Sequence, residues 1–136
     1  MKKTIAILCS LFCFAGAIFA QSTASALPDD EIKVDLSKKV INVPRENAHL
    51  DEKDKTASVR IEYIPMVDEA RIYYTCMYVQ YDSGRAMNSV LGCLEDFTKE
   101  NKYYHYKYMS KDRERYYKDS RGISWAEYSS HVKFTR

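Results

Sequence analysis

Alternation of apolar and polar residues predicts two neighbouring strands near the middle of the chain. In residues 57–63 every second residue is apolar and every residue between is polar, which is the period of a strand with one buried face. Residues 71–81 follow after a short connection and are largely apolar on both alternating sides, as expected for a central strand. Two strands this close in sequence predict an antiparallel hairpin.

Shorter stretches on either side extend the predicted sheet. Residues 40–43 precede Pro44, which cannot donate to a strand ladder and therefore indicates an edge strand. The polar residues 45–56 predict a loop, and the charged residues 111–115 predict a turn or hairpin tip. The other predicted strands are residues 32–36, 103–109, 116–118, 123–128 (or a helical turn there) and 131–134.

The period changes after residue 82 and predicts one amphipathic helix at about residues 83–99. Asp82 or Ser83 can cap its first turn, because a short oxygen-bearing side chain accepts from a free backbone amide. Asn101 is a reasonable end. The apolar positions follow the spacing of one helical face and are Met87, Val90, Leu91, Leu94 and Phe97.

These elements predict one α+β domain over residues 32–136. We expect an antiparallel sheet of about four to six strands, with the helix packed on one face, in the order β-β-α-β-β. A single apolar stripe on one helix covers only one face of a sheet. The other face would carry many of the 12 tyrosines, which suit interfaces because the ring is apolar and its tip is polar.

The first 20 residues have the pattern of a signal peptide. Lys2 and Lys3 precede an apolar run, and small residues allow cleavage after Ala20 or after Ala26. The apolar run is just shorter than the ~20 residues of a spanning helix, although an uncleaved membrane anchor is the alternative. Residues 21–31 predict a flexible lead-in. We therefore expect an exported bacterial protein, periplasmic or secreted, without membrane association after cleavage.

Two cysteines, Cys76 and Cys93, lie beyond the leader. In an exported protein a disulfide is the expected state of such a pair, and closing this loop would stabilise the fold by about 3 kcal/mol. The alternative is two buried free thiols. The spacing is not that of a redox-active pair, so the cysteines predict a structural disulfide.

The net charge gives no indication of a nucleic-acid partner. The formal charge is +2, and it falls to zero when Lys2 and Lys3 leave with the signal peptide, because 19 basic and 19 acidic residues remain. The charge is nevertheless uneven, since residues 83–136 hold 11 basic and 7 acidic residues. The basic half could pair with the acidic half or face an anionic partner.

Catalytic, metal and cofactor motifs are not found in the sequence. His49, His105 and His131 are scattered without metal-ligand spacing, and no nucleophile-elbow or phosphate-binding glycine motif occurs. We therefore expect no metal, no cofactor and a non-catalytic role. A small secreted hydrolase remains the alternative, with carboxylates such as Asp112 and Glu114 near the predicted hairpin tip.

The strongest candidate for a binding surface is the tyrosine-rich and basic stretch after the helix. Tyrosine with arginine and lysine is typical of protein interfaces and of surfaces that bind anionic polymers. Tyrosine also favours strands, so an ordinary half-buried sheet is the other interpretation. We expect a protein or an anionic polymer of the envelope or host as the partner. The predicted surface comprises Tyr104, Tyr106, Tyr108, Arg113, Arg115, Tyr117 and Lys118.

Overall fold

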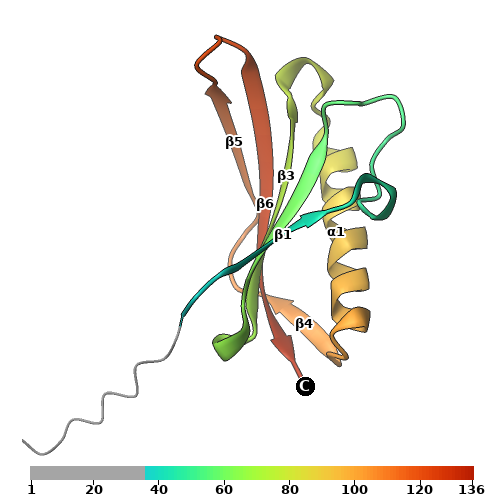
Figure 1. Cartoon of the computed structure of the whole chain (residues 1–136), viewed down its shortest axis with the longest axis vertical. Coiled ribbons are helices and arrows are strands. Elements are labelled where there is room, and N and C mark those ends of the chain that lie inside the picture. The colour runs from blue at the N-terminus through green and yellow to red at the C-terminus, as the bar shows by residue number, and fades with distance from the viewer. Residues whose placement is uncertain (1–35) are drawn as a thin grey trace, which may run out of the picture. The chain divides into compact units, whose positions relative to one another are not determined.

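The computed structural model describes residues 36–136, which form a six-stranded antiparallel sheet packed against one α-helix (Figure 1). The predicted α+β class, with one main helix on an antiparallel sheet, is confirmed. The predicted signal peptide (1–20) and lead-in (21–31) lie outside the described residues, as do all but the last residue of the strand predicted at 32–36.

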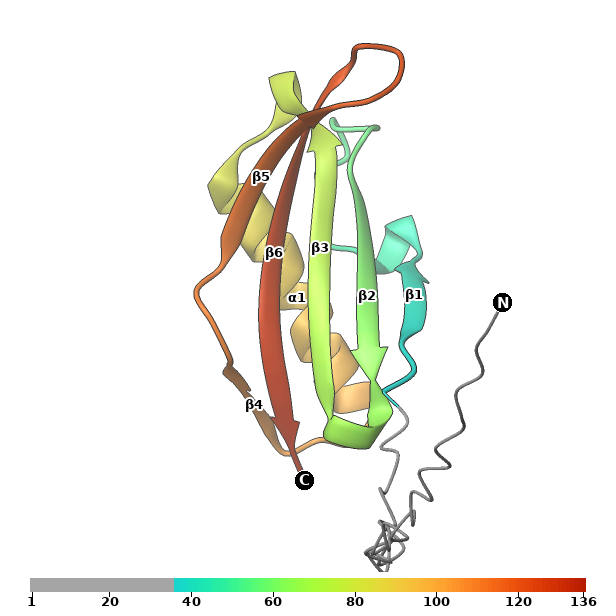
Figure 2. The ribbon, with the colours of Figure 1, turned by 90° about the vertical axis from the view of Figure 1, so that its left-hand side faces the viewer.

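Three strands precede the helix and three follow it, so the chain has one more strand on each side than the predicted β-β-α-β-β order. Across the sheet the order is β1-β2-β3-β6, and both β4 and β5 pair with the outer edge of β6 (Figure 2). The elements are β1 Lys39–Val43, β2 Ser58–Ile64, β3 Glu69–Met77, α1 Ser83–Glu100, β4 His105–Tyr108, β5 Arg113–Lys118 and β6 Ser124–Thr135, with 3₁₀ turns at Arg45–Asn47, Pro65–Val67 and Tyr78–Gln80.

The C-terminal part of the sheet differs from its prediction. Residues 113–115 belong to strand β5 and not to a turn, and β6 is one continuous strand of 12 residues. Strand β6 bonds to β3 along one edge and to β4 and β5 along the other. Strand β5 is exposed along its whole length, and charged residues are common on such edges because they discourage pairing with another chain.

The core lies between the sheet and α1. Alternate residues of the central strands face the helix, so that Ile72 of β3 and Val132 of β6 are fully buried. The helix contributes Val90 and Leu94, which are also buried completely. Their removal from water is the main favourable contribution to folding.

The helix is capped as predicted but buries a slightly different face. Asp82 is the N-cap, and its side chain accepts a hydrogen bond from the backbone N–H of Arg85 (2.8 Å). Met87 is 43% exposed and Leu91 is half-buried, so these two positions of the predicted stripe do not enter the core. The sheet instead selects a stripe centred on Ala86, Val90, Cys93, Leu94 and Phe97.

The predicted disulfide is not formed: Cys76 and Cys93 are both free and buried. Cys76 lies next to the last residue of β3, whereas Cys93 lies about 15 Å along the axis from the first residue of α1. A disulfide requires Cα atoms within roughly 7 Å. The Cys93 thiol contacts the carbonyl oxygen of Asn47 (3.8 Å). The prediction was wrong because it rested only on the expected export of the protein and on the number of cysteines. It did not include the distance between the two positions.

We expect both thiols to be unreactive in the folded protein and reactive after unfolding. Burial raises the pKa of Cys76, and it raises the pKa of Cys93 to about 11, so very little reactive thiolate is present at neutral pH. Alkylation without reductant, followed by peptide mass spectrometry, should label both cysteines in denaturant and neither in buffer. A peptide pair linked through Cys76 and Cys93 would contradict this prediction.

Candidate functional site

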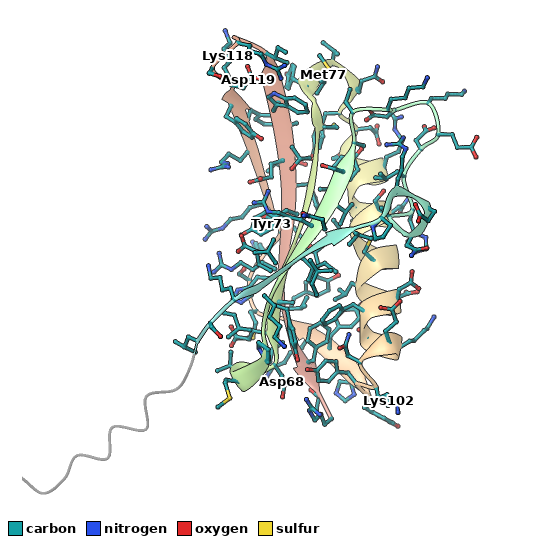
Figure 3. The ribbon with its side chains drawn as sticks, viewed as in Figure 1. Asp68, Tyr73, Met77, Lys102, Lys118 and Asp119 are labelled. Carbon is teal, nitrogen blue, oxygen red and sulfur yellow. The ribbon has the colours of Figure 1, made fainter. Side chains whose placement is uncertain are left out.

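One face of the sheet is not covered by any element among residues 36–136. The helix packs on the opposite face, so the view of Figure 2 looks directly at the uncovered strands with α1 behind them. Figure 3 shows Tyr73 near the middle of β3, between Asp68 and Met77 towards its two ends. We call this surface the open face. Its side chains come from residues 40 and 42 of β1, 58, 60, 62 and 64 of β2, 69, 71, 73, 75 and 77 of β3, 105 and 107 of β4, 113, 115 and 117 of β5, and 125, 127, 129, 131, 133 and 135 of β6.

Basic residues outnumber acidic residues on the open face. Each strand contributes polar positions that alternate with the buried ones, and cross-strand pairing brings these positions into adjacent rows. The six cations come from five strands, β2 to β6. Only three carboxylates lie on the same face. The cations are Arg60, Arg71, Lys107, Arg113, Arg115 and Lys133, and the carboxylates are Glu62, Glu69 and Glu127.

Glu127 links two arginines at the centre of the open face. Its side chain is only 8% exposed, and its carboxylate lies 3.2 Å from Arg115 Nη2 and 3.6 Å from Arg60 Nη2. Each arginine also lies over an aromatic ring, with Arg60 4.3 Å from the centroid of Tyr73 and Arg115 5.1 Å from that of Tyr117. These contacts hold both guanidinium groups in place, so Arg60 and Arg115 are already paired with a carboxylate of the protein itself.

The other two carboxylates of the open face, those of Glu69 and Glu62, also contact basic side chains. Glu69 lies 3.1 Å from His131 Nε2 and 3.9 Å from Lys133 Nζ. Glu62 contacts Lys38 Nζ (3.7 Å) and Arg60 Nε (3.9 Å). Three cations therefore remain on the open face without an ion pair to any residue of 36–136, namely Arg71, Lys107 and Arg113. All three are exposed to solvent.

The structure brings together only part of the predicted binding surface. Arg113, Arg115 and Tyr117 lie on the open face, because they pair with Ser129, Glu127 and Trp125 of β6. The other four residues do not share that face. Tyr106, Tyr108 and Lys118 pair with Phe134, Val132 and Ser124 and point towards the helix side, and Tyr104 lies in the turn before β4, 84% exposed.

The prediction missed the part of the open face that comes from β2, β3 and β6. Arg60, Arg71 and Tyr73 belong to β2 and β3, and His131 and Glu127 belong to β6. The signal was present in the alternation itself, since the polar positions of residues 57–63 must lie on the side opposite the apolar ones. Which strand lies beside which could not be obtained from that pattern.

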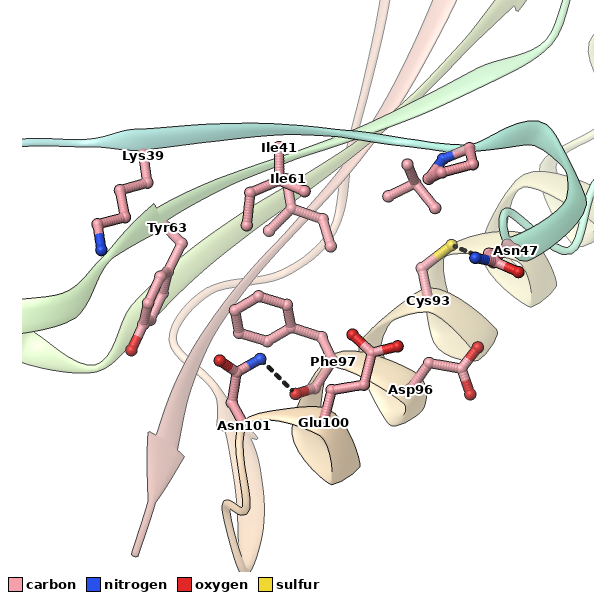
Figure 4. Close-up of a pocket in the computed structure, with 12 residues that line it drawn as sticks. Lys39, Ile41, Asn47, Ile61, Tyr63, Cys93, Asp96, Phe97, Glu100 and Asn101 are labelled. Carbon is pink, nitrogen blue, oxygen red and sulfur yellow. Dashed lines mark hydrogen bonds between the residues drawn. The ribbon is translucent and has the colours of Figure 1, made fainter.

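A second concave surface lies between β1 and the C-terminal half of α1 (Figure 4). This groove has a volume of about 680 Å³. Ile41, Ile61, Tyr63 and Phe97 provide apolar surface in it, and Figure 4 shows their side chains between the strand and the helix. Its polar residues carry both signs of charge and include Lys39, Asp96 and Glu100. The groove therefore combines apolar side chains with one cation and two carboxylates, which gives no basis for binding an anion.

Within residues 36–136 the arrangement of reactive groups does not form a catalytic triad. His131 and Glu69 resemble the histidine–carboxylate part of one, but no hydrogen bond joins His131 to a serine, threonine or cysteine in this part of the chain. Asp112 accepts from Tyr128 and Ser130, and Glu114 accepts from Tyr116. The same residues contain no cluster of three or more His, Cys, Asp or Glu that could hold a metal ion.

Comparison with protein-family models, with curated proteins and with solved structures gives no match to this chain. Among residues 36–136, no helix has the length and apolar character needed to cross a membrane. The geometry and charge of the open face are therefore the observations from which a function can be argued.

Proposed function

We propose that this is a non-catalytic binding protein, exported by a bacterium, whose open face binds an anionic polymer of the cell envelope or the host. The observation that carries the proposal is the set of unpaired, exposed cations Arg71, Lys107 and Arg113 on an uncovered sheet face. The signal-like pattern of residues 1–20 supports export. Among residues 36–136, no residue cluster supports a reaction as directly.

A polymer suits this face better than a small ligand, because its cations are spread over several strands. Arg71 lies on the central strand β3, Arg113 on β5 and Lys107 on β4. Strand β3 alone is about 30 Å long. Near one end of the open face, beyond Arg115, the exposed ring of Tyr117 and the half-buried ring of Trp125 offer flat surfaces on which sugar rings can pack. Several modest contacts along one chain can add to a useful affinity.

The test is binding of dextran sulfate by the triple variant R71Q/K107Q/R113Q. None of these residues makes an ion pair within residues 36–136, so their replacement leaves no carboxylate without its partner. An exposed charge contact contributes roughly 0.2–1 kcal/mol, so the affinity should fall about tenfold. For the unaltered protein, binding should weaken as salt rises from 50 to 300 mM, because salt screens exposed charges.

The matched control is K53Q/K55Q/K99Q, which removes the same charge from exposed positions in the β1–β2 loop and on α1. We expect this control to retain nearly the affinity of the unaltered protein. Equal losses in both triple variants would show that only net charge matters and would contradict a site on the open face. No binding of dextran sulfate at low salt would contradict the polymer, and a protein partner would then be the surviving alternative.

A further inference from the structure

The edge of the sheet is interrupted at one place, where β4 ends and β5 begins. Both strands pair with the same edge of β6, β4 with residues 132–135 and β5 with residues 124–129. Five steps along the chain from Tyr108 to Arg113 oppose only three steps from Val132 to Ser129. The outer chain therefore carries two extra residues, which form a wide bulge in the edge. Bulges re-aim side chains and are frequent beside functional sites.

A cavity of about 140 Å³ opens on the open face beside this bulge. Its cationic side chains come from three separate segments: Arg71 from β3, Lys111 from the bulge and Arg113 from β5. His131 lies in the same lining, together with Ser110 and Ser129. No aspartate or glutamate of residues 36–136 lines the cavity, although three permanent positive charges surround it.

The nearby carboxylates, those of Asp112 and Glu69, contact other side chains and not the three cations of the cavity. Asp112 stands between Lys111 and Arg113 in sequence, but its carboxylate accepts hydrogen bonds from Tyr128 and Ser130, the latter at 2.7 Å. Glu69 binds His131 and Lys133. The side chains of Arg71, Lys111 and Arg113 make no ion pair or hydrogen bond within residues 36–136. Cations that line one cavity without a counter-charge repel one another. An anion between these three side chains would relieve that repulsion.

We propose that this cavity binds a tetrahedral oxyanion, a sulfate or phosphate ester group carried by the polymer. The proposal rests on the proposed function and names the group that the open face recognises. A tetrahedral ester presents three terminal oxygens, which suits cationic donors that approach from three segments. Arginine is the side chain best shaped for such groups, because its planar fork donates two parallel hydrogen bonds. The hydroxyl groups of Ser110 and Ser129 supply neutral donors.

A carboxylate fits this lining less well. It has only two oxygens, which lie in one plane, so it satisfies fewer of the donors than the three terminal oxygens of a tetrahedral ester. Its single charge equals that of a sulfate ester and is smaller than that of a phosphate monoester. We therefore expect the cavity to prefer inorganic sulfate and phosphate over acetate. A preference for phosphate over sulfate would assign a phosphate monoester, and the reverse preference would assign a sulfate ester.

The test is titration calorimetry of the full chain with inorganic phosphate, sulfate and acetate at constant ionic strength. We expect saturable binding of one tetrahedral anion per chain. R71Q and R113Q should each weaken it about tenfold or more, since a charge-assisted hydrogen bond is lost. The matched control is K99Q, which removes one exposed charge from α1, outside the cavity and outside the open face, and it should change the dissociation constant less than twofold. Circular dichroism checks folding, and R113Q on the exposed edge strand gives the same test if R71Q does not fold.

Equal weakening in R71Q, R113Q and K99Q, or acetate binding as tight as sulfate, would overturn the cavity as the site. The two proposals can fail separately. If dextran sulfate still binds and loses affinity in the triple variant while no small anion saturates the protein, the cavity is wrong and the binding face stands. If phosphate or sulfate saturates the cavity while dextran sulfate does not bind, the polymer is wrong and the oxyanion site stands.

Discussion

Replacing Leu94 with Ala is expected to lower the free energy of unfolding by about 2–5 kcal/mol. Leu94 lies on α1 and is completely buried against the sheet. The substitution removes apolar surface from the core and leaves a cavity that the surrounding strands can fill only in part. Urea unfolding, followed by circular dichroism, measures the change through a lower midpoint at an unchanged slope.

Met87→Ala is the matched control for Leu94→Ala. Met87 belongs to the same apolar stripe in the sequence, but it is 43% exposed in the structure. Both substitutions shorten a long side chain to Ala on the same helix, so their effects on helix propensity are similar and small. We expect a loss below about 0.5 kcal/mol for Met87→Ala. Equal losses at the two positions would show that the helix buries the stripe predicted from sequence and not the observed one.

Glu127→Gln is expected to change stability and binding in opposite directions. Glu127 is the carboxylate that holds Arg60 and Arg115 together, and its side chain is 8% exposed. The arginines are 38% and 67% exposed, so solvent screens much of the interaction and the loss should be about 1 kcal/mol. The substitution also frees Arg115 from its only carboxylate among residues 36–136, while Arg60 keeps its contact with Glu62, and it removes one negative charge from the open face. Affinity for dextran sulfate should therefore rise about threefold, measured under the same conditions as for the triple variant.

Glu114→Gln is the control for Glu127→Gln, since it makes the same charge change on the other side of strand β5. Glu114 is exposed and accepts a hydrogen bond from Tyr116 (2.8 Å). We expect its affinity for dextran sulfate to stay close to that of the unaltered protein. A rise of the same size in both variants would attribute the effect to net charge, and a fall in Glu127→Gln would contradict the proposed binding face.

The parts of the fold that local periodicity specifies could be predicted from the sequence. Strand β2, the hairpin of β2 with β3, and helix α1 with its Asp82 cap all depend on residues close in the chain. Only the second half of strand β5, residues 116–118, could be predicted, and the charged first half, residues 113–115, lacks an alternating pattern and predicted a turn. It forms a strand through pairing with β6, and such pairing joins positions that are distant in sequence.

The candidate site could be predicted only in part for the same reason. A run of tyrosines and basic residues along one strand is divided between two faces of the sheet, so Arg113 and Lys118 of β5 cannot share a surface. The residues that do join Arg113, such as Arg71 and His131, come from other strands. The bulge at residues 109–112 is likewise invisible in the sequence, because it follows from the register of two strands against a third.

The central claim is that the open face, and not the groove beside α1, is the binding surface. Amide chemical shifts of the isotope-labelled protein, recorded with and without a sulfated dextran oligosaccharide, test it most directly. The account predicts that the largest shift changes fall on Arg71, Arg113 and Ser129 around the cavity. The largest changes at Ile41, Phe97 and Asn101, which line the groove, would contradict it.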